Sequence, residues 1–381
     1  MRRDVDKKSR KRYRSNPVKT TCFFLVAILA GLAVLSCGER KQERQQPRST
    51  KLALQEGYPP SVIEVLQGHH AAVLYAMRNW NQSQVQSVIV VSKTWDPRKT
   101  VTVAFEGGTP ALRSQIVQAI KPWTDSSNLH LDFGPNSSSG AYREWANSDT
   151  SFSADVRIAF GSGGYWSMVG NDSVNPALSR PNQPSMNFEG FTSELPSDWQ
   201  GTVLHEFGHA VGFQHEHQSP ASPCDSDFRW NDDVGYIQTK DIYGQFVPDP
   251  EGRNPGIYTV LGGPPNNWSR DQIDFNLKQL PNSVDLRLSA FDKDSIMKYY
   301  FPGWMFNNGD RSACWSKENL SLSAEDQRAA LQTYPRDAAQ IQNAVNEQMK
   351  VFQNLFDLSE LPSQLRSQYK SKIESLKNDH Q

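Results

Sequence analysis

The sequence predicts an α+β fold, because short runs typical of strands alternate with helical periodicity ahead of one histidine-bearing helix. Residues 100–105, TVTVAF, alternate in character as a half-buried strand does. Residues 111–123 carry large apolar side chains at helical spacing. Residues 129–133 and 156–160 have the length and composition of further short strands, and residues 185–188 are expected to form the last strand before the histidine-bearing helix.

The start of the chain has the layout of a bacterial export signal. Residues 1–21 carry nine Lys or Arg against two Asp or Glu, and residues 22–35 form an uncharged apolar run that is too short to span a bilayer comfortably. Residues 34–37, VLSC, resemble the lipobox of bacterial lipoproteins, in which the cysteine is lipidated and becomes the mature N-terminus. We therefore expect residues 1–36 to be a lipoprotein signal peptide and Cys37 to be the lipidation site. A signal anchor and ordinary secretory cleavage are the alternatives.

This interpretation places the protein in a bacterial cell envelope, anchored in the membrane through an N-terminal lipid. Gly38 is not the Asp that favours retention in the inner membrane of enteric bacteria, so the outer membrane is favoured if the cell has one. A secreted protein is the alternative. Residues 1–21 have a net charge of +7 and the whole chain −1, so the remainder carries −8, which makes nucleic acid a poor partner.

Four further segments follow the signal. Residues 37–60 are polar and punctuated by proline, as in a flexible tether. Residues 61–94 are expected to be a helical N-terminal segment, and residues 95–335 the domain proper, which ends with a closing helix. Residues 336–381 form a helical tail with two apolar stripes separated by a proline, either a hairpin packed on the domain or an arm that binds a partner.

Residues 205–215, HEFGHAVGFQH, carry the most specific chemical signal in the chain. On a helix, positions four apart share a face, so His205 and His209 project together. Glu206 lies beside them, and the apolar side chains fall on the opposite side of the helix. One helix therefore buries an apolar stripe and turns two imidazoles and a carboxylate the other way.

The sequence also predicts both ends of this helix. Ser197 followed three residues later by Gln200 is typical of a capping box. Gly212 can adopt the left-handed conformation that ends a helix. The chain can then turn sharply and bring His215 toward the other two histidines.

Three neutral imidazoles with a fourth position left open suit a catalytic zinc ion, Zn²⁺. We expect His205, His209 and His215 to bind it. Glu206 is not needed as a ligand and suits a general base acting on metal-bound water. The longer form of the motif, with a glycine and a third histidine, is typical of zinc peptidases.

The stretch resembles the zinc-binding motif of the metzincin metallopeptidases, and its continuation, residues 213–216, is similar to the astacin branch. The match then breaks, because astacins usually carry an arginine shortly afterwards and this chain continues HQSP. The resemblance also implies a methionine turn, and residues 294–299, DSIMKY, match it with Lys298 where histidine is usual. It implies that Met297 forms a floor under the metal and that Tyr299 stabilises the transition state.

The same resemblance covers residues 95–335 in outline and implies the fold. That fold is a twisted mixed sheet with two long helices, a zinc cleft, and a less regular C-terminal half with a closing helix. It also implies that an edge strand within residues 163–170 borders the cleft and pairs with the backbone of the substrate. A plain surface hairpin is the alternative for these residues.

Two cysteines remain outside the signal region. Cys224 follows the zinc-binding stretch and Cys314 follows the methionine turn. An exported compartment allows disulfides, so a bridge between them is expected. Two free buried thiols are the alternative.

Together these features predict a lipid-anchored, zinc-dependent endopeptidase that hydrolyses protein or peptide substrates with Glu206 as general base. The alternative is a surface binding or adhesion module that keeps a non-catalytic zinc site. A closed structural site would need a fourth protein ligand and would have no use for Glu206, which favours the enzyme.

Overall fold

The computed structural model describes residues 57–79, 91–135, 137–279 and 291–378. The chain divides into two compact units, Met1–Ser49 and Thr50–Gln381, and every described residue belongs to the second. The predicted signal peptide, Cys37 and nearly all of the predicted tether lie outside the described residues. No helix in the described ranges combines the length and the apolar character needed to cross a membrane.

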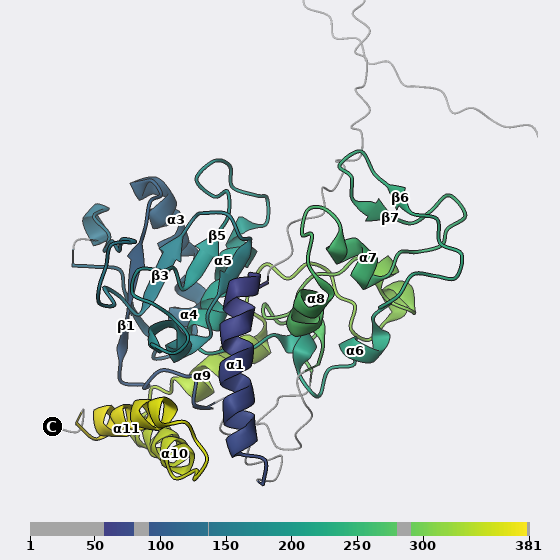
Figure 1. Cartoon of the computed structure of the whole chain (residues 1–381). Helices are drawn as coiled ribbons and strands as arrows, with labels where there is room; N and C mark the ends of the chain where they lie inside the picture. The colour runs from purple at the N-terminus through teal and green to yellow at the C-terminus, as the bar shows by residue number, and fades with distance from the viewer. Residues whose placement is uncertain (1–56, 80–90, 136, 280–290, 379–381) are drawn as a thin grey trace, which may run out of the picture. The chain divides into compact units, whose positions relative to one another are not determined.

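A five-stranded mixed sheet underlies the first half of the second unit (Figure 1). Its spatial order is β2-β1-β3-β5-β4; β1 pairs in parallel with β2 and β3, β3 pairs in parallel with β5, and β4 runs antiparallel to β5 at the edge. The α+β class and the mixed sheet are confirmed. The strands are β1 (Thr100–Phe105), β2 (His130–Asp132), β3 (Val156–Ala159), β4 (Tyr165–Ser167) and β5 (Met186–Phe188).

The single helix predicted over residues 111–123 is wrong, because two helices occupy this stretch. They are α3 (Pro110–Ala119) and α4 (Lys121–Ser126), and Ile120 is both the C-cap of the first and the N-cap of the second. Pro122 has no backbone N–H to donate to a carbonyl one turn earlier, so the first helix cannot continue through it. The apolar side chains of both helices still enter the same core as the sheet.

The histidine-bearing helix is α5 (Trp199–Ala210), and its predicted capping box is wrong. The N-cap is Asp198, whose side chain makes no capping hydrogen bond. The backbone closes the turn before the helix instead, since the amide of Trp199 donates to the carbonyl of Pro196 over 3.2 Å. The predicted end is confirmed: Gly212 has a φ of +106°, two residues past the last helical residue.

The second half of the unit is less regular and is built around aromatic side chains and one disulfide. Cys224 and Cys314 are fully buried and bonded to each other, which confirms the predicted bridge. Phe228, Phe301 and Phe306 pack beside it. Its elements are α6 (Cys224–Asp227), β6 (Thr239–Lys240), β7 (Phe246–Val247), α7 (Ile257–Gly262) and α8 (Arg270–Leu277).

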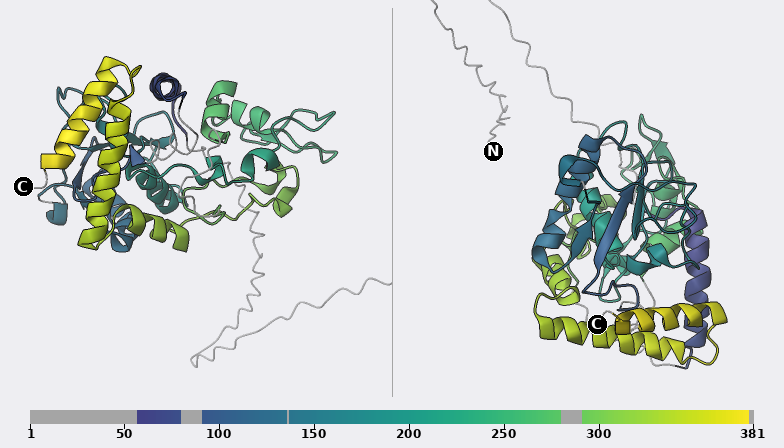
Figure 2. Two further views of the ribbon diagram at one scale, coloured as in Figure 1. Left: turned by 90° about the horizontal axis from the view of Figure 1, so that it is seen from below. Right: turned by 90° about the vertical axis from the view of Figure 1, so that its left-hand side faces the viewer.

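The C-terminal residues form a helical hairpin, as one of the two alternatives for the tail anticipated. Helices α10 (Ala338–Phe356) and α11 (Ser363–Asn378) lie side by side in both views of Figure 2 and share an apolar cluster with α1 (Pro60–Ala76). The side-chain amide of Gln348 donates to the carbonyl of Trp95 over 2.8 Å, which ties the hairpin to the start of the sheet region. The closing helix is α9 (Ala324–Thr333). The boundaries predicted at residues 95 and 335 stay predictions.

Candidate metal centre

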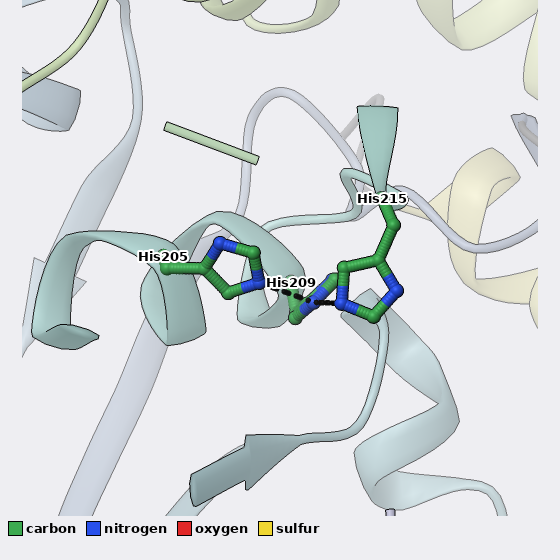
Figure 3. Close-up of side chains that lie close together, drawn as sticks. All are labelled: His205, His209 and His215. Atoms are coloured by element: carbon green, nitrogen blue, oxygen red, sulfur yellow. Dashed lines mark hydrogen bonds between the residues drawn. The ribbon is translucent and has the colours of Figure 1, made fainter. Parts of the chain in front are cut away.

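His205, His209 and His215 converge on one point (Figure 3). The first two project from the same face of α5, and the turn at Gly212 brings the third back toward them. Their candidate ligand nitrogens all lie within 4.8 Å of one another, and the side chains are only 2, 3 and 5% exposed. The fold therefore brings together all three histidines that the sequence motif predicts as ligands.

The second nitrogen of each imidazole is held by an oxygen that can only accept a hydrogen bond. His205 Nδ1 lies 2.7 Å from the carbonyl of Ile296, and His209 Nδ1 lies 2.7 Å from that of Phe213. His215 Nδ1 lies 2.8 Å from Gln218 Oε1. Each Nδ1 must therefore carry the proton. In a neutral ring, the Nε2 atom then carries a lone pair that can bind a metal ion.

These three Nε2 atoms point at one another, which makes the site suitable for a cation. The distances are 3.1 Å from His205 to His209 and 2.9 Å from His209 to His215, marked by the dashed lines in Figure 3. Two lone pairs at such a distance repel and cannot form a hydrogen bond. Tetrahedral zinc with Zn–N bonds of about 2.0–2.1 Å would hold its nitrogens roughly 3.4 Å apart, so a small outward shift accommodates the ion.

Burial keeps the three imidazoles in the neutral form that binds metal. It lowers the pKa of His209 to about 4, and it holds the pKa of His205 and of His215 well below the ordinary value. Among the described residues no fourth His, Cys, Asp or Glu joins the cluster. A zinc ion held here would keep a coordination position for a non-protein ligand, as catalytic sites do.

Two predicted catalytic residues are buried, one beside His205 along α5 and one against the histidine rings. Glu206 follows His205 on α5 and is 1% exposed. The ring of Tyr299 lies 4.4 Å from that of His215 and 5.4 Å from that of His205, measured between centroids. The ring of Tyr299 therefore borders the histidine cluster, and Glu206 is buried next to the first histidine along the helix.

The predicted methionine turn contacts α5 and the segment that follows it. The carbonyl of Ile296 accepts from His205, and the carbonyl of Met297 accepts from the amide of Glu216 over 2.9 Å. Met297 is 3% exposed and lies against Gly208, where a methyl group would come within 2.2 Å of its sulfur. The glycine between the first two histidines therefore allows the close approach of Met297.

Several supporting residues were not predicted from the sequence. Asp326 caps α9 with Ser323, and the same carboxylate accepts from the Ser295 hydroxyl over 2.6 Å and from the Ile296 amide over 2.8 Å. The ammonium of Lys298, which replaces the usual histidine, donates to the carbonyl of Tyr299, and burial lowers its pKa to about 8. An acidic residue at the third position of a helix, such as Asp326, is typical of a capping box. Nothing in the sequence indicates that Asp326 also binds the methionine turn.

The helix α5 is held in place by hydrogen bonds from buried side chains to its carbonyls. The indole of Trp123 donates to Leu204 over 2.9 Å, and the indole of Trp95 donates to Ala210 over 2.8 Å. The hydroxyl of Tyr334, at the end of α9, donates to Val211 over 2.6 Å. The bonds to Ala210 and Val211 satisfy carbonyls at the C-terminal end of α5, where both residues are buried.

The chain is similar to several solved structures. No protein-family model matches the chain, and no curated protein does. A structure of myroilysin is 28% identical, with a TM-score of 0.47, over 65% of this chain and 98% of that chain. A second myroilysin structure is 24% identical, with a TM-score of 0.39, over 64% of this chain and 87% of that one. High choriolytic enzyme 1, a hatching-enzyme zinc protease from the medaka fish Oryzias latipes, is 14% identical, with a TM-score of 0.34, over 63% and 93%.

Proposed function

We propose that this chain is a zinc-dependent endopeptidase of the astacin-like kind. The observation that carries the proposal is the convergence of the three Nε2 atoms, and the buried Glu206 that follows His205 on the same helix supports it. His205, His209 and His215 would hold the ion. When bound, zinc would act as a Lewis acid that activates water and polarises a carbonyl.

The chain's own residues supply the proton transfers of peptide hydrolysis. Glu206 takes a proton from the attacking water as the water oxygen bonds to the peptide carbonyl carbon. It then gives that proton to the amine nitrogen as the carbon–nitrogen bond breaks. We assign to the hydroxyl of Tyr299, whose ring lies 4.4 Å from that of His215 between centroids, a hydrogen bond to the oxygen that becomes negatively charged.

The edge strand β4 is the proposed docking line for the substrate backbone. Tyr165–Ser167 form the last strand of the sheet and pair with β5, and the carbonyl of Tyr165 also accepts from the amide of Gly57 over 2.9 Å, which supports pairing of an extended backbone along this edge. The strand also packs against α5. A peptide added there would run past the metal centre.

Metal analysis combined with a cleavage assay tests the proposal. The purified protein should contain about one zinc per chain, and it should cleave denatured casein until a chelator removes the metal. Activity should return when zinc is added back. A protein that binds zinc and cleaves nothing across a broad peptide library would favour the binding or adhesion module instead.

We also propose that the protein is anchored in a bacterial cell envelope through a lipid on Cys37. The support is the lipobox-like sequence at residues 34–37 after an apolar run of signal-peptide length. Cys37→Ser should move the protein out of the membrane fraction or leave it unprocessed. Retention of the variant in the membrane at the mature size would contradict lipidation.

A further inference from the structure

The two residues that end the segment after the third histidine bind carbonyls at the C-terminal end of α8. The side-chain nitrogen of Gln218 donates to the carbonyls of Phe275 and Lys278 over 2.8 and 3.0 Å. His217 Nε2 lies 3.0 Å from the carbonyl of Asn276, which can only accept a hydrogen bond, so this nitrogen carries a proton. Carbonyls in the last turn of a helix lack partners within the helix, and these two side chains supply them.

The imidazole of His217 is fully buried and neutral. Its side chain is 0% exposed, and burial lowers its pKa to about 3. Because Nε2 carries the proton of the neutral ring, Nδ1 carries a lone pair, and this buried atom has no hydrogen-bond partner among the described residues. A phenylalanine would fill the same space without an unsatisfied nitrogen. What histidine adds at this place is the hydrogen bond from Nε2 to α8.

The ring of His217 contacts the ring of Tyr299. Their centroids lie 4.6 Å apart, and the angle between the two planes is 33°. Tyr299 is 4% exposed and is also in contact with the rings of His215 and Phe301, at centroid distances of 4.4 and 6.0 Å. The orientation of the phenol is therefore set by the rings around it, and His217 connects it to the end of α8.

The backbone of Tyr299 is held separately from its side chain. The ammonium of Lys298 donates to the carbonyl of Tyr299 over 3.0 Å and to the hydroxyl of Ser316 over 3.1 Å. With the main chain held in this way, the remaining freedom of Tyr299 is rotation of its side chain. Contact with the ring of His217 limits that rotation.

We infer that His217 is a positioning residue, which holds the phenol of Tyr299 in the orientation that peptide hydrolysis needs, and that its hydrogen bond to the carbonyl of Asn276 is what fixes it there. The inference rests on the proposed function and on the role assigned to Tyr299. His217 needs no contact with substrate, because it acts through the tyrosine. A donor to a developing oxyanion must be accurately placed, and a misplacement of about 1 Å can cost about 10²-fold in rate.

Three substitutions in the full chain separate the hydrogen bond of His217 from its packing. His217→Phe keeps a ring against Tyr299 but has no donor, and the amide of His217→Asn is too short to reach the carbonyl of Asn276. Both should lower kcat for a fluorogenic peptide by about tenfold or more, with KM within about twofold of the wild-type value, because the oxyanion contact is made only in the transition state. His217→Gln is the matched control: its amide can place a donor where Nε2 lies, and kcat should stay within about threefold of wild type.

A double-substitution cycle with Tyr299→Phe tests whether His217 acts through the tyrosine. The Tyr299→Phe protein has no hydroxyl to place, so adding His217→Phe or His217→Asn to it should lower kcat by less than about twofold further. Titration against a competing chelator should give every variant the zinc affinity of the wild type, because Gln218, not His217, holds the third ligand.

Three results would overturn the inference alone. The first is an equal loss of kcat with and without the Tyr299 hydroxyl. The second is a loss of zinc affinity in proportion to the loss of activity, and the third is a His217→Gln protein as slow as His217→Phe and His217→Asn. Zinc-loaded wild-type protein that cleaves no peptide would remove the proposed function, and the inference with it.

Discussion

Each imidazole of the metal centre is oriented by the partner of its second nitrogen. Two of these partners are backbone carbonyls, of Ile296 and Phe213, and the third is the side-chain oxygen of Gln218. The amide group of Gln218 is itself fixed, because its nitrogen donates to the carbonyls of Phe275 and Lys278. The third ligand is therefore the one whose orientation a single side-chain substitution can disturb.

Gln218→Ala should weaken zinc binding while leaving the three histidines in place. Loss of such an outer partner costs about 10–100-fold in metal affinity, because the ring is no longer held in the correct tautomer and orientation. Gln279→Ala is the control, since that amide also donates to backbone carbonyls, of Ser219 and Pro220, but contacts no histidine. Titration against a competing chelator measures both. Equal zinc affinities for the two variants would contradict the orienting role of Gln218.

Gly208→Ala should destabilise the protein, although alanine favours helices. The added methyl group would lie 2.2 Å from the sulfur of Met297 and 3.0 Å from the ring of Trp123. Overpacking of this kind costs about 1–3 kcal/mol. Gly68→Ala in α1 is the control, because nothing lies within 4 Å of the new methyl group, and it should stabilise by about 0.5–1 kcal/mol. Urea unfolding compares the two, and a stabilised Gly208→Ala protein would refute the close contact.

At the scale of elements, the metal centre depends on segments that are far apart along the chain. A carbonyl of the methionine turn accepts a hydrogen bond from the first histidine, and Asp326 at the start of α9 accepts one from the backbone of the same turn. Gln218 links the third histidine to helix α8, because its side chain accepts from His215 and donates to the carbonyl of Phe275. The two halves of the unit are thus joined at the histidines by hydrogen bonds as well as by packing.

The disulfide stabilises the second half, which has little regular structure of its own. Cys224 and Cys314 are separated by 90 positions, so in the chain-entropy model their bond contributes about 4.6 kcal/mol. Replacing both with alanine should lower the free energy of unfolding by about that amount. Chemical denaturation of the double variant and of reduced wild-type protein should give matching curves. An unfolding free energy unchanged from the oxidised protein would show that the bridge contributes no stability.

The sequence predicted those elements whose signals are local. Strand β1 was predicted with its exact bounds, Thr100–Phe105, because alternation over six residues has one consistent register. The break at Ile120 was missed because the apolar spacing continues through it, although Pro122 was a visible signal. The predicted N-cap of α5, Ser197, was wrong. The N-cap is Asp198, one residue later, and its side chain makes no capping hydrogen bond.

The candidate site divides in the same way. The three histidines and Tyr299 stand in short motifs, so their meeting could be predicted from spacing and resemblance. Gln218 and His217 could not, because each acts through partners on α8 that lie more than fifty positions away. Such long-range contacts leave no pattern in a single sequence.

At the scale of the whole molecule, the metal centre is buried where the two halves of the unit meet. The three histidines and Glu206 are at most 5% exposed. Tyr58 and α1 lie against both β4, the proposed docking line for the substrate, and α8.

The measurement that bears most directly on the central claim is the activity of Glu206→Gln. The substitution keeps the shape of the side chain and all three imidazoles, and it removes the base that carries the proton to the leaving amine. We predict near-stoichiometric zinc, an unchanged fold, and peptidase activity lower by at least about two orders of magnitude, the scale of lost general acid–base catalysis. A Glu206→Gln protein that binds zinc and cleaves peptides at the wild-type rate would contradict the account.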